Sequence, residues 1–320
     1  MTFSSHEKIA VFSCKGLGDG LITLILSHHL SKRHRVTTFH PFLQELQRWF
    51  PHLPLQPFPS CLEEFDRFFL FYERTPWMKK ILSTCLLHYR SKTTILNPIA
   101  TSHRDYPYWE EGRFDGALSF VENLTIFCRD ILGIEDSHRE NGISIPQGIV
   151  YRKYAKRITL HPTSSRRGKN WPRSKFLRLA DTLKSQGWDP IFLVSPMERA
   201  EWPESPLFPN LDAVARFIFE SAYIIGNDSG IGHLASCMGI PTLSIFRNKR
   251  SSTFWRPSFR EGVVLLPKGR LPNLKWLRWR DKYWHWEISV CDVIRAFNQL
   301  CILGHETSLS SVLKKVNIIG

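Results

Sequence analysis

The sequence predicts an α/β protein with two doubly wound parallel sheets, one in each half of the chain. Short apolar segments alternate with amphipathic helical segments in both halves, and this alternation is typical of parallel sheets covered by helices. The alternation weakens over residues 137–152 and then starts again. A chain of 320 residues suits two domains of ordinary size. We therefore expect an N-terminal domain at 1–145, a C-terminal domain at 153–300 and a tail at 301–320.

The first half contains four apolar segments with the length of buried strands, and helical segments follow them. The strands are expected at residues 8–13, 35–39, 66–72 and 92–96. The helices are expected at 21–30, 41–50, 77–89 and 121–132. Two further segments are predicted to be loops, a proline-rich one at 51–59 and a long polar one at 97–116. Long loops in compact domains often bind ligands, so the second is a candidate binding loop.

The second half repeats the pattern. Its strands are expected at residues 157–160, 191–194, 223–226 and 242–246. The first helix starts at Pro172, a residue that suits the first helical turn, and Gly187 closes it. Further helices are expected at 211–219, after Gly230 and at 288–301. In sheets of this kind, ligands bind beyond the carboxyl ends of the strands.

The strongest single signal is the segment 224–241, which is predicted to be strand, turn and helix. Four apolar residues mark one face of the helix by their spacing: Ile231, Leu234, Ala235 and Met238. The first N–H groups of such a helix are free to bind a phosphate or another anion. Ser229 and Gly230 permit close approach of a ligand to the backbone. Asp228 is either a helix cap or a carboxylate that accepts hydrogen bonds from sugar hydroxyls, and both interpretations hold if Ser229 is the cap.

A second strand-to-helix turn, from Lys15 to Gly20, is rich in glycine. It is not the dinucleotide fingerprint, because Leu21 stands where a glycine is needed, and it is not a P-loop, because no G-K-[ST] follows. Asp19 in this turn is either a helix cap or a functional carboxylate. A third loop after a strand, 161–172, is polar and basic. If the two domains face each other, all three loops meet in one central cleft.

The formal net charge of +14 indicates an acidic partner, unless the basic residues only form a solvated surface without a specific target. Candidate partners are nucleic acid, an anionic membrane surface and a phosphorylated substrate. The basic residues are spread over both halves and no helix-turn-helix, RRM or zinc-finger pattern occurs, which disfavours nucleic acid. The segment 275–286 interleaves aromatic and basic residues. It either docks at a membrane interface, stacks on sugar rings or bases, or packs as an aromatic core segment.

No apolar run approaches the roughly 20 residues that span a bilayer, and residues 1–8 contain no signal-peptide core. We therefore expect a cytoplasmic protein. The seven cysteines include no C-x-x-C pair, which argues against a zinc cluster or a disulfide framework. Five lie in apolar surroundings and are expected to be buried thiols: Cys14, Cys128, Cys237, Cys291 and Cys301.

Three motifs together resemble the lipopolysaccharide heptosyltransferase family, glycosyltransferase family 9. The segment Ile225–Ala235 is similar to the family's second nucleotide-sugar motif. His161–Ser165, followed by Lys169 and Trp171–Pro172, resembles its other C-terminal motif. Gly16-Leu17-Gly18-Asp19 is similar to its N-terminal glycine loop and aspartate. The motifs occur in the family's order, and the combination is more specific than any one of them.

The resemblance implies a GT-B fold of two Rossmann-like domains. It also implies an inverting, metal-independent transfer of heptose from ADP-heptose to the inner core of lipopolysaccharide, with no cofactor beyond the nucleotide sugar. The absence of any D-x-D pair is compatible with this. The implied acceptor is an anionic lipid-linked glycan at the inner face of the cytoplasmic membrane. After the aspartate the family often has a hydroxyl or histidine and a proline, whereas this chain has Gly20–Leu26, a departure that concerns the acceptor more than the donor.

On this resemblance, Asp19 is the expected general base, carried by a glycine loop that contains Gly16 and Gly18. Eight residues are expected to bind the donor: Thr163, Ser164, Ser165, Lys169, Asp228, Ser229, Gly230 and His233. Lys169 and the helix N–H groups would hold the diphosphate, and Asp228 would bind hydroxyls of the ribose or heptose. His233 is either a donor contact or a structural histidine. No metal ligands are expected.

Alternatives from other classes stay open on the sequence alone. A GT-B glycosyltransferase with a different nucleotide-sugar donor would use the same loops. A non-catalytic relative would bind nucleotide without turnover, although the presence of both Asp19 and Asp228 argues against it. A nucleic-acid-binding protein is the third alternative. A screen of nucleotide donors would separate the first alternative, and failure to bind any nucleotide would favour the second or the third.

Overall fold

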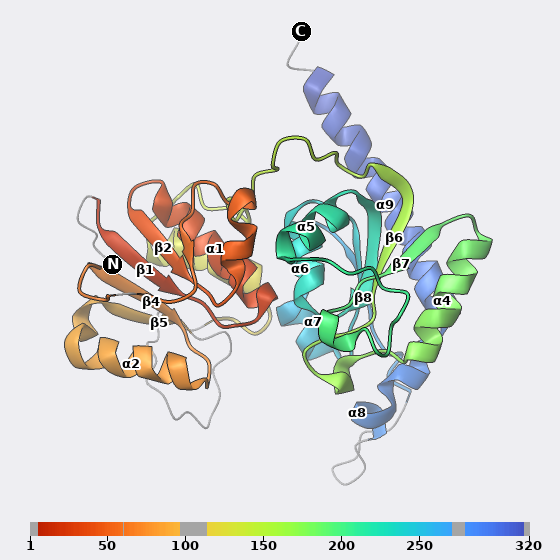
Figure 1. Ribbon diagram of the computed structural model, residues 1–320, viewed down its shortest axis with the longest axis horizontal. Helices are drawn as coiled ribbons and strands as arrows, with labels where there is room; N and C mark the ends of the chain where they lie inside the picture. Colours follow the sequence, from red (N-terminus) through yellow and green to blue (C-terminus); the bar gives the residue numbers. More distant parts are fainter. Residues whose placement is uncertain (1–5, 60, 97–113, 271–278, 317–320) are drawn as a thin grey trace. The chain divides into compact units, whose positions relative to one another are not determined.

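The structure is a computed structural model that describes residues 6–59, 61–96, 114–270 and 279–316. The chain divides into two compact units, Met1–Ile149 with Pro209–Ala215, and Val150–Phe208 with Arg216–Gly320. Each unit contains a five-stranded sheet in which every paired strand is parallel (Figure 1). The predicted fold class of two parallel α/β sheets is confirmed.

The sheet of the first unit has the strand order β3-β2-β1-β4-β5. Its strands are β1 (Lys8–Phe12), β2 (Arg35–Phe39), β3 (Leu55–Gln56), β4 (Arg67–Phe71) and β5 (Thr93–Leu96). Central strand β1 pairs on both sides, with Ile9 opposite Val36 and Arg67. Every residue of β1 after Lys8 is buried, because helices cover both faces of a doubly wound sheet.

The helices of the first unit are α1 (Leu17–Ser31), α2 (Pro76–His88) and α3 (Phe120–Ile126), the last continued by a π-helical turn at Phe127–Ile131. Helix α2 packs through Met78, Leu82 and Cys85 on the core formed by β1, β2, β4 and β5. Helix α1 packs against α3. The α-helix predicted at 41–50 is instead a 3₁₀ helix at Leu43–Trp49, since the prolines that bound this short segment leave little room for regular α-helical turns.

The sheet of the second unit has the order β10-β9-β8-β6-β7. Its strands are β6 (Tyr154–His161), β7 (Asp189–Phe192), β8 (Ser221–Asn227), β9 (Thr242–Ile245) and β10 (Val263–Leu265). All seven residues of the central strand β8 are buried. Edge strands β3 and β10 were not expected from the sequence, because two or three residues are too few for a periodic signal.

The helices that follow β6 in the chain are α4 (Arg173–Ser185), α5 (Leu211–Phe219), α6 (Gly230–Cys237), α7 (Lys249–Trp255), α8 (Trp279–Tyr283) and α9 (Val290–Val316). Helix α5 passes from the first unit to the second after Ala215. Helices α4 and α9 contribute to one core with the central strands. Helix α9 was expected to end near Cys301, but it continues to Val316, since no proline interrupts that stretch.

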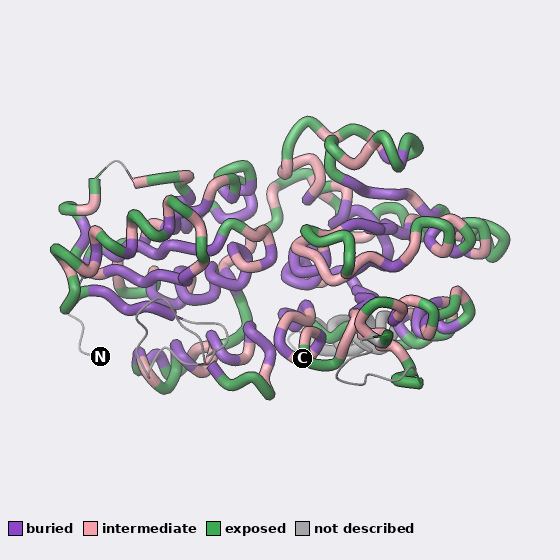
Figure 2. The backbone as a smooth tube through the Cα atoms, turned by 90° about the horizontal axis from the view of Figure 1, so that it is seen from below, coloured by how far each residue is buried: buried purple, intermediate pink, exposed green. Residues whose placement is uncertain are grey.

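Burial follows the sheets in both units, as the purple strands in Figure 2 show. Two of the cysteines expected to be buried are not: Cys291 is exposed and Cys301 is half-buried. The buried stripe of α9 is Val293, Ala296, Phe297 and Leu300, and Cys291 lies on the opposite side of the helix.

No helix in the described ranges is long and apolar enough to cross a membrane.

Candidate functional site

The carboxyl end of β8 carries an ion pair between residues 59 positions apart. Asp228 follows β8 directly, and its Oδ2 atom lies 2.7 Å from Lys169 Nζ. The hydroxyl of Ser251, in α7, donates to the same oxygen at 3.2 Å. The Asp228 side chain is 10% exposed and that of Lys169 is 28% exposed. The two predicted donor residues of opposite charge are therefore in contact, and Ser251 is an additional member of the cluster.

Asn227 joins the two loops that carry this pair. Its Oδ1 atom accepts the Trp171 N–H at 3.0 Å, and its Nδ2 atom donates to the Pro162 carbonyl at 2.7 Å. One buried amide thereby closes both ends of residues 163–170. At Gly226 a Cβ would lie 2.9 Å from the His161 carbonyl oxygen, so only glycine permits the two strands to approach this closely. From the sequence, Asn227 was expected only to be a turn residue.

The hydroxyl residues of this loop have different surroundings. Thr163 is buried and donates to Glu198 Oε2 at 3.1 Å. Ser164 bonds within the loop, to Asn170 Oδ1 at 2.7 Å, and Ser165 is exposed. Glu198 was missed by the sequence analysis, although it completes a capping box with Ser195 just after β7, a pattern that the S-P-M-E sequence contains.

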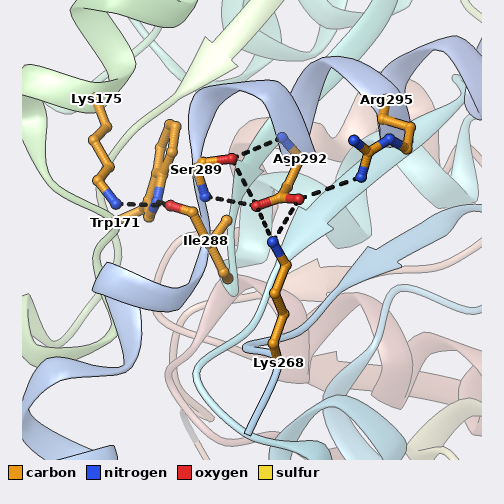
Figure 3. A network of polar contacts seen from close by, with 7 residues as sticks. All are labelled: Trp171, Lys175, Lys268, Ile288, Ser289, Asp292 and Arg295. Carbon is orange, nitrogen blue, oxygen red and sulfur yellow. Dashed lines mark hydrogen bonds and ion pairs between the residues drawn. The ribbon is translucent and has the colours of Figure 1, made fainter. Parts of the chain in front are cut away.

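The far end of the same loop is anchored to the start of α9 (Figure 3). Trp171 Nε1 and Lys175 Nζ both donate to the Ile288 carbonyl, at 3.1 and 2.7 Å. Ser289 and Asp292 then cap α9 through reciprocal hydrogen bonds. Burial raises the pKa of Asp292, but hydrogen bonds from Ser289 and Lys268 outweigh it and lower that pKa to about 2. The loop that carries Lys169 is therefore held at the Ile288 carbonyl, just before α9, as well as by Asn227.

Helix α6 begins beside the ion pair. Ser229 occupies the N-cap position without making a side-chain cap, and its buried Oγ atom has no hydrogen-bond partner among the described residues. The Nδ1 atom of His233, one turn later, is also buried without a partner there. Burial is the main cause that lowers the His233 pKa to about 4; Asp228 opposes the shift and Lys169 adds to it. His233 is therefore neutral near pH 7.

The carboxyl end of β1 carries Asp19, which is half-buried in the first turn of α1. The helix starts at Leu17, four residues before the predicted start, and its N-cap position is Gly16 rather than Asp19. A Cβ on Gly16 would overlap Asp19 Oδ2, and Gly18 is buried in the same turn. Burial, followed by the charges of Asp19 and Glu73, raises the pKa of the Cys14 thiol. Two carboxylates thus lie near this strand end.

Two predicted binding segments lie partly outside the described residues. Residues 97–113 of the polar loop 97–116 and residues 275–278 of the aromatic segment 275–286 are not described. Trp284 is 2% exposed and belongs to the core, so it is not available for docking as the sequence had suggested. Trp279 and Trp286 are exposed, and Tyr283 stacks on Trp286 at a centroid distance of 4.4 Å.

No group of His, Cys, Asp or Glu in the described part is arranged to hold a metal ion.

Comparison with known families gives a match over the part of the chain that contains the ion pair. Residues 135–283 match the model of glycosyltransferase family 9 (heptosyltransferase). Residues 135–283, slightly less than half of the chain, are therefore similar to glycosyltransferase family 9. The resemblance to this family that the motifs indicated is confirmed, and the match supports a glycosyltransferase.

Related proteins agree with this assignment. The chain is 25% identical to lipopolysaccharide heptosyltransferase 3 of Escherichia coli over 256 residues, which are 70% of this chain and 71% of that protein. It shares its fold with a family 9 glycosyltransferase of Veillonella parvula, with 17% identity, a TM-score of 0.69 and coverage of 94% and 99%. E. coli heptosyltransferase WaaC, solved with ADP-2-deoxy-2-fluoro heptose, has 12% identity, a TM-score of 0.63 and coverage of 91% and 99%.

Proposed function

We propose that this enzyme transfers heptose from ADP-heptose to the inner core of lipopolysaccharide, with inversion at the sugar carbon and without a metal ion. The observation that carries the proposal is the Lys169–Asp228 pair at the start of α6, in a chain that resembles family 9. The related WaaC binds ADP-2-deoxy-2-fluoro heptose in its solved structure, which supports this donor class.

The donor binds along the carboxyl ends of β6 and β8. Lys169 and the N–H groups at Ser229 and Gly230 hold the diphosphate, since a cation and a helix N-terminus both favour anions. Asp228 accepts hydrogen bonds from sugar hydroxyls, and Thr163, Ser164 and Ser165 line the adjoining loop. The buried Ser229 Oγ and His233 Nδ1 atoms have no hydrogen-bond partner within the described part of the chain, which supports a polar ligand here, because buried polar atoms normally have partners.

Asp19 is the proposed general base. An acceptor hydroxyl oxygen attacks the anomeric carbon of the donor, on the face opposite the diphosphate. As the new C–O bond forms, the bond to the diphosphate oxygen breaks and the hydroxyl proton moves to the Asp19 carboxylate. Negative charge grows on the departing ADP, where Lys169 and the α6 N–H groups stabilise it. Loss of one such contact costs on the order of 3 kcal/mol of activation free energy.

The acceptor is an anionic lipid-linked glycan at a membrane surface. The net charge of +14 favours such a partner, and exposed Trp279 and Trp286 with Lys282 supply aromatic and basic contacts for an interface. Co-sedimentation with vesicles should therefore rise with anionic lipid content and fall with salt. Binding that ignores both variables would exclude this mode of attachment.

The first test is calorimetric binding of ADP, UDP, GDP and CMP. We expect selective binding of ADP that weakens in Lys169→Ala and stays unchanged in Lys184→Ala, a matched loss of an exposed lysine on α4. Preference for UDP or GDP would keep the site but replace the donor. Failure to bind any nucleotide would overturn the proposal.

A further inference from the structure

His40, the residue that follows β2, has a ring whose two nitrogens are both engaged with backbone. Its Nε2 atom lies 3.2 Å from the Gly16 carbonyl oxygen. Its Nδ1 atom lies 3.3 Å from the Phe42 amide nitrogen and 3.2 Å from that of Leu43. A carbonyl only accepts hydrogen bonds and an amide N–H only donates them. The ring is therefore neutral, with its proton on Nε2.

The hydrogen bond from His40 ends at the Gly16 carbonyl oxygen, an atom that also belongs to the start of α1. The Gly16 carbonyl also accepts the Gly20 N–H at 2.9 Å, so it is held from α1 and from the end of β2 at once. Strands β1 and β2 are neighbours in the sheet, and α1 follows β1 (Figure 1). The glycine turn is thus fixed to the adjacent strand by one imidazole.

The glycines of this turn fit around the same two side chains. A Cβ on Gly20 would lie 2.8 Å from both Cδ2 and Nε2 of His40. A Cβ on Gly16 would overlap the Asp19 carboxylate. The imidazole is 1% exposed, so its place is fixed by packing as well as by hydrogen bonds. Gly16, Gly20 and His40 therefore set the position of the turn from which Asp19 projects.

We propose that His40 is a positioning residue for Asp19, which it serves by holding the Gly16 carbonyl and with it the first turn of α1. The inference rests on the proposed role of Asp19 as general base. Burial lowers the His40 pKa to about 4, opposed by the bond to Gly16, so the donating neutral form persists through the physiological range. A displaced carboxylate loses alignment with the acceptor hydroxyl, and misplacement of about 1 Å can reduce a rate on the order of 100-fold.

The kinetic test compares two amide replacements. Asn in His40→Asn keeps an acceptor near the Nδ1 position but loses the donor to Gly16, whereas Gln in His40→Gln places an N–H near Nε2. We expect kcat to fall roughly 10- to 100-fold in His40→Asn with the donor KM unchanged, and to recover in large part in His40→Gln. His29→Asn, a matched buried histidine at the other end of α1, should retain wild-type kcat.

Two further measurements separate positioning from general damage. The Asp19→Asn variant measures the proposed base alone; if it turns over like wild type, the proposed function fails and so does this inference. If Asp19→Asn is impaired, adding His40→Asn should give little further loss, and an additive loss would overturn positioning alone. Independently of turnover, ¹⁵N NMR at pH 7 should find His40 protonated on Nε2; a proton on Nδ1 would also overturn the inference.

Discussion

At Asp228, one carboxylate oxygen accepts both the Lys169 ammonium and the Ser251 hydroxyl. The charge of Lys169 is therefore largely neutralised before any anion binds. Under the proposed function, a diphosphate would share this cation with Asp228, and the weaker attraction would help ADP to leave after transfer.

The first prediction tests this sharing with Asp228→Asn. Removal of the carboxylate charge leaves Lys169 unpaired, so inorganic pyrophosphate, which has no ribose to contact Asp228, should bind more tightly than to wild type. Sugar transfer is not needed for this readout, since titration calorimetry measures pyrophosphate binding directly. Asp181→Asn, an exposed acid on α4, is the matched control. Weaker pyrophosphate binding in Asp228→Asn would contradict the shared-cation interpretation.

The second prediction concerns the side-chain amide of Asn227, which closes the loop at residues 163–170. In Asn227→Asp a carboxylate oxygen replaces the Nδ2 donor beside the Pro162 carbonyl, in a position that is 2% exposed. We expect a loss of about 1–3 kcal/mol in the free energy of unfolding and faster hydrogen exchange over residues 163–170. ADP affinity should also fall, because the loop becomes less ordered. Asn298→Asp, at an exposed residue of α9, should change neither the free energy of unfolding nor the rate of hydrogen exchange. Unchanged hydrogen exchange over residues 163–170 in Asn227→Asp would exclude the role of Asn227 in closing the loop.

Among the elements, the long buried strands and amphipathic helices could be predicted, whereas the start of α1 could not. Gly18 and Gly20 have low helix propensity, and the predicted helix therefore began at Leu21. In the folded chain, packing against β2 overrides propensity and includes both glycines in α1. The motifs identified Lys169 and Asp228. Their contact could not be predicted, because the sequence does not give the order of the strands in each sheet. The same reason applies to the loop closure by Asn227 and to the contacts of Ser251, Glu198 and His40.

The third prediction follows from the packing that places Gly20 in α1 despite its low helix propensity. Gly20→Ala would raise helix propensity by about 1 kcal/mol in an unconstrained helix. Here the added Cβ meets His40 and Leu43 at 2.8 Å, and both are buried. We expect overpacking to dominate and to lower the free energy of unfolding by about 1–3 kcal/mol in urea titrations. Gly168→Ala, where a Cβ meets nothing within 4 Å, is the control, and stabilisation by Gly20→Ala would contradict the fitted turn.

Across the whole molecule, each unit contains a buried neutral histidine, one directly after β2 and one in α6. His40 lies in the first unit and His233 in the second, and burial lowers both pKa values from 6.5 to about 4. In the unfolded chain both imidazoles bind a proton near pH 6.5. The unfolded state therefore binds more protons than the folded state between pH 6.5 and 4, and stability must fall as pH falls through this window.

The fourth prediction is that acid weakens both units. Each shift corresponds to about 3 kcal/mol once the pH is well below about 4, and to a smaller loss at about pH 5. Near His233 the charges of Asp228 and Lys169 act in opposite directions, so burial controls the sign. Pulsed hydrogen exchange in urea, followed on peptides from β1 and β8, should show lower midpoints at pH 5 than at pH 7 in both units. Replacement of His233 by Gln should reduce the pH dependence of β8 and leave that of β1 unchanged. A midpoint that rises on acidification would contradict the prediction, since a histidine that burial holds neutral can only lower stability as pH falls.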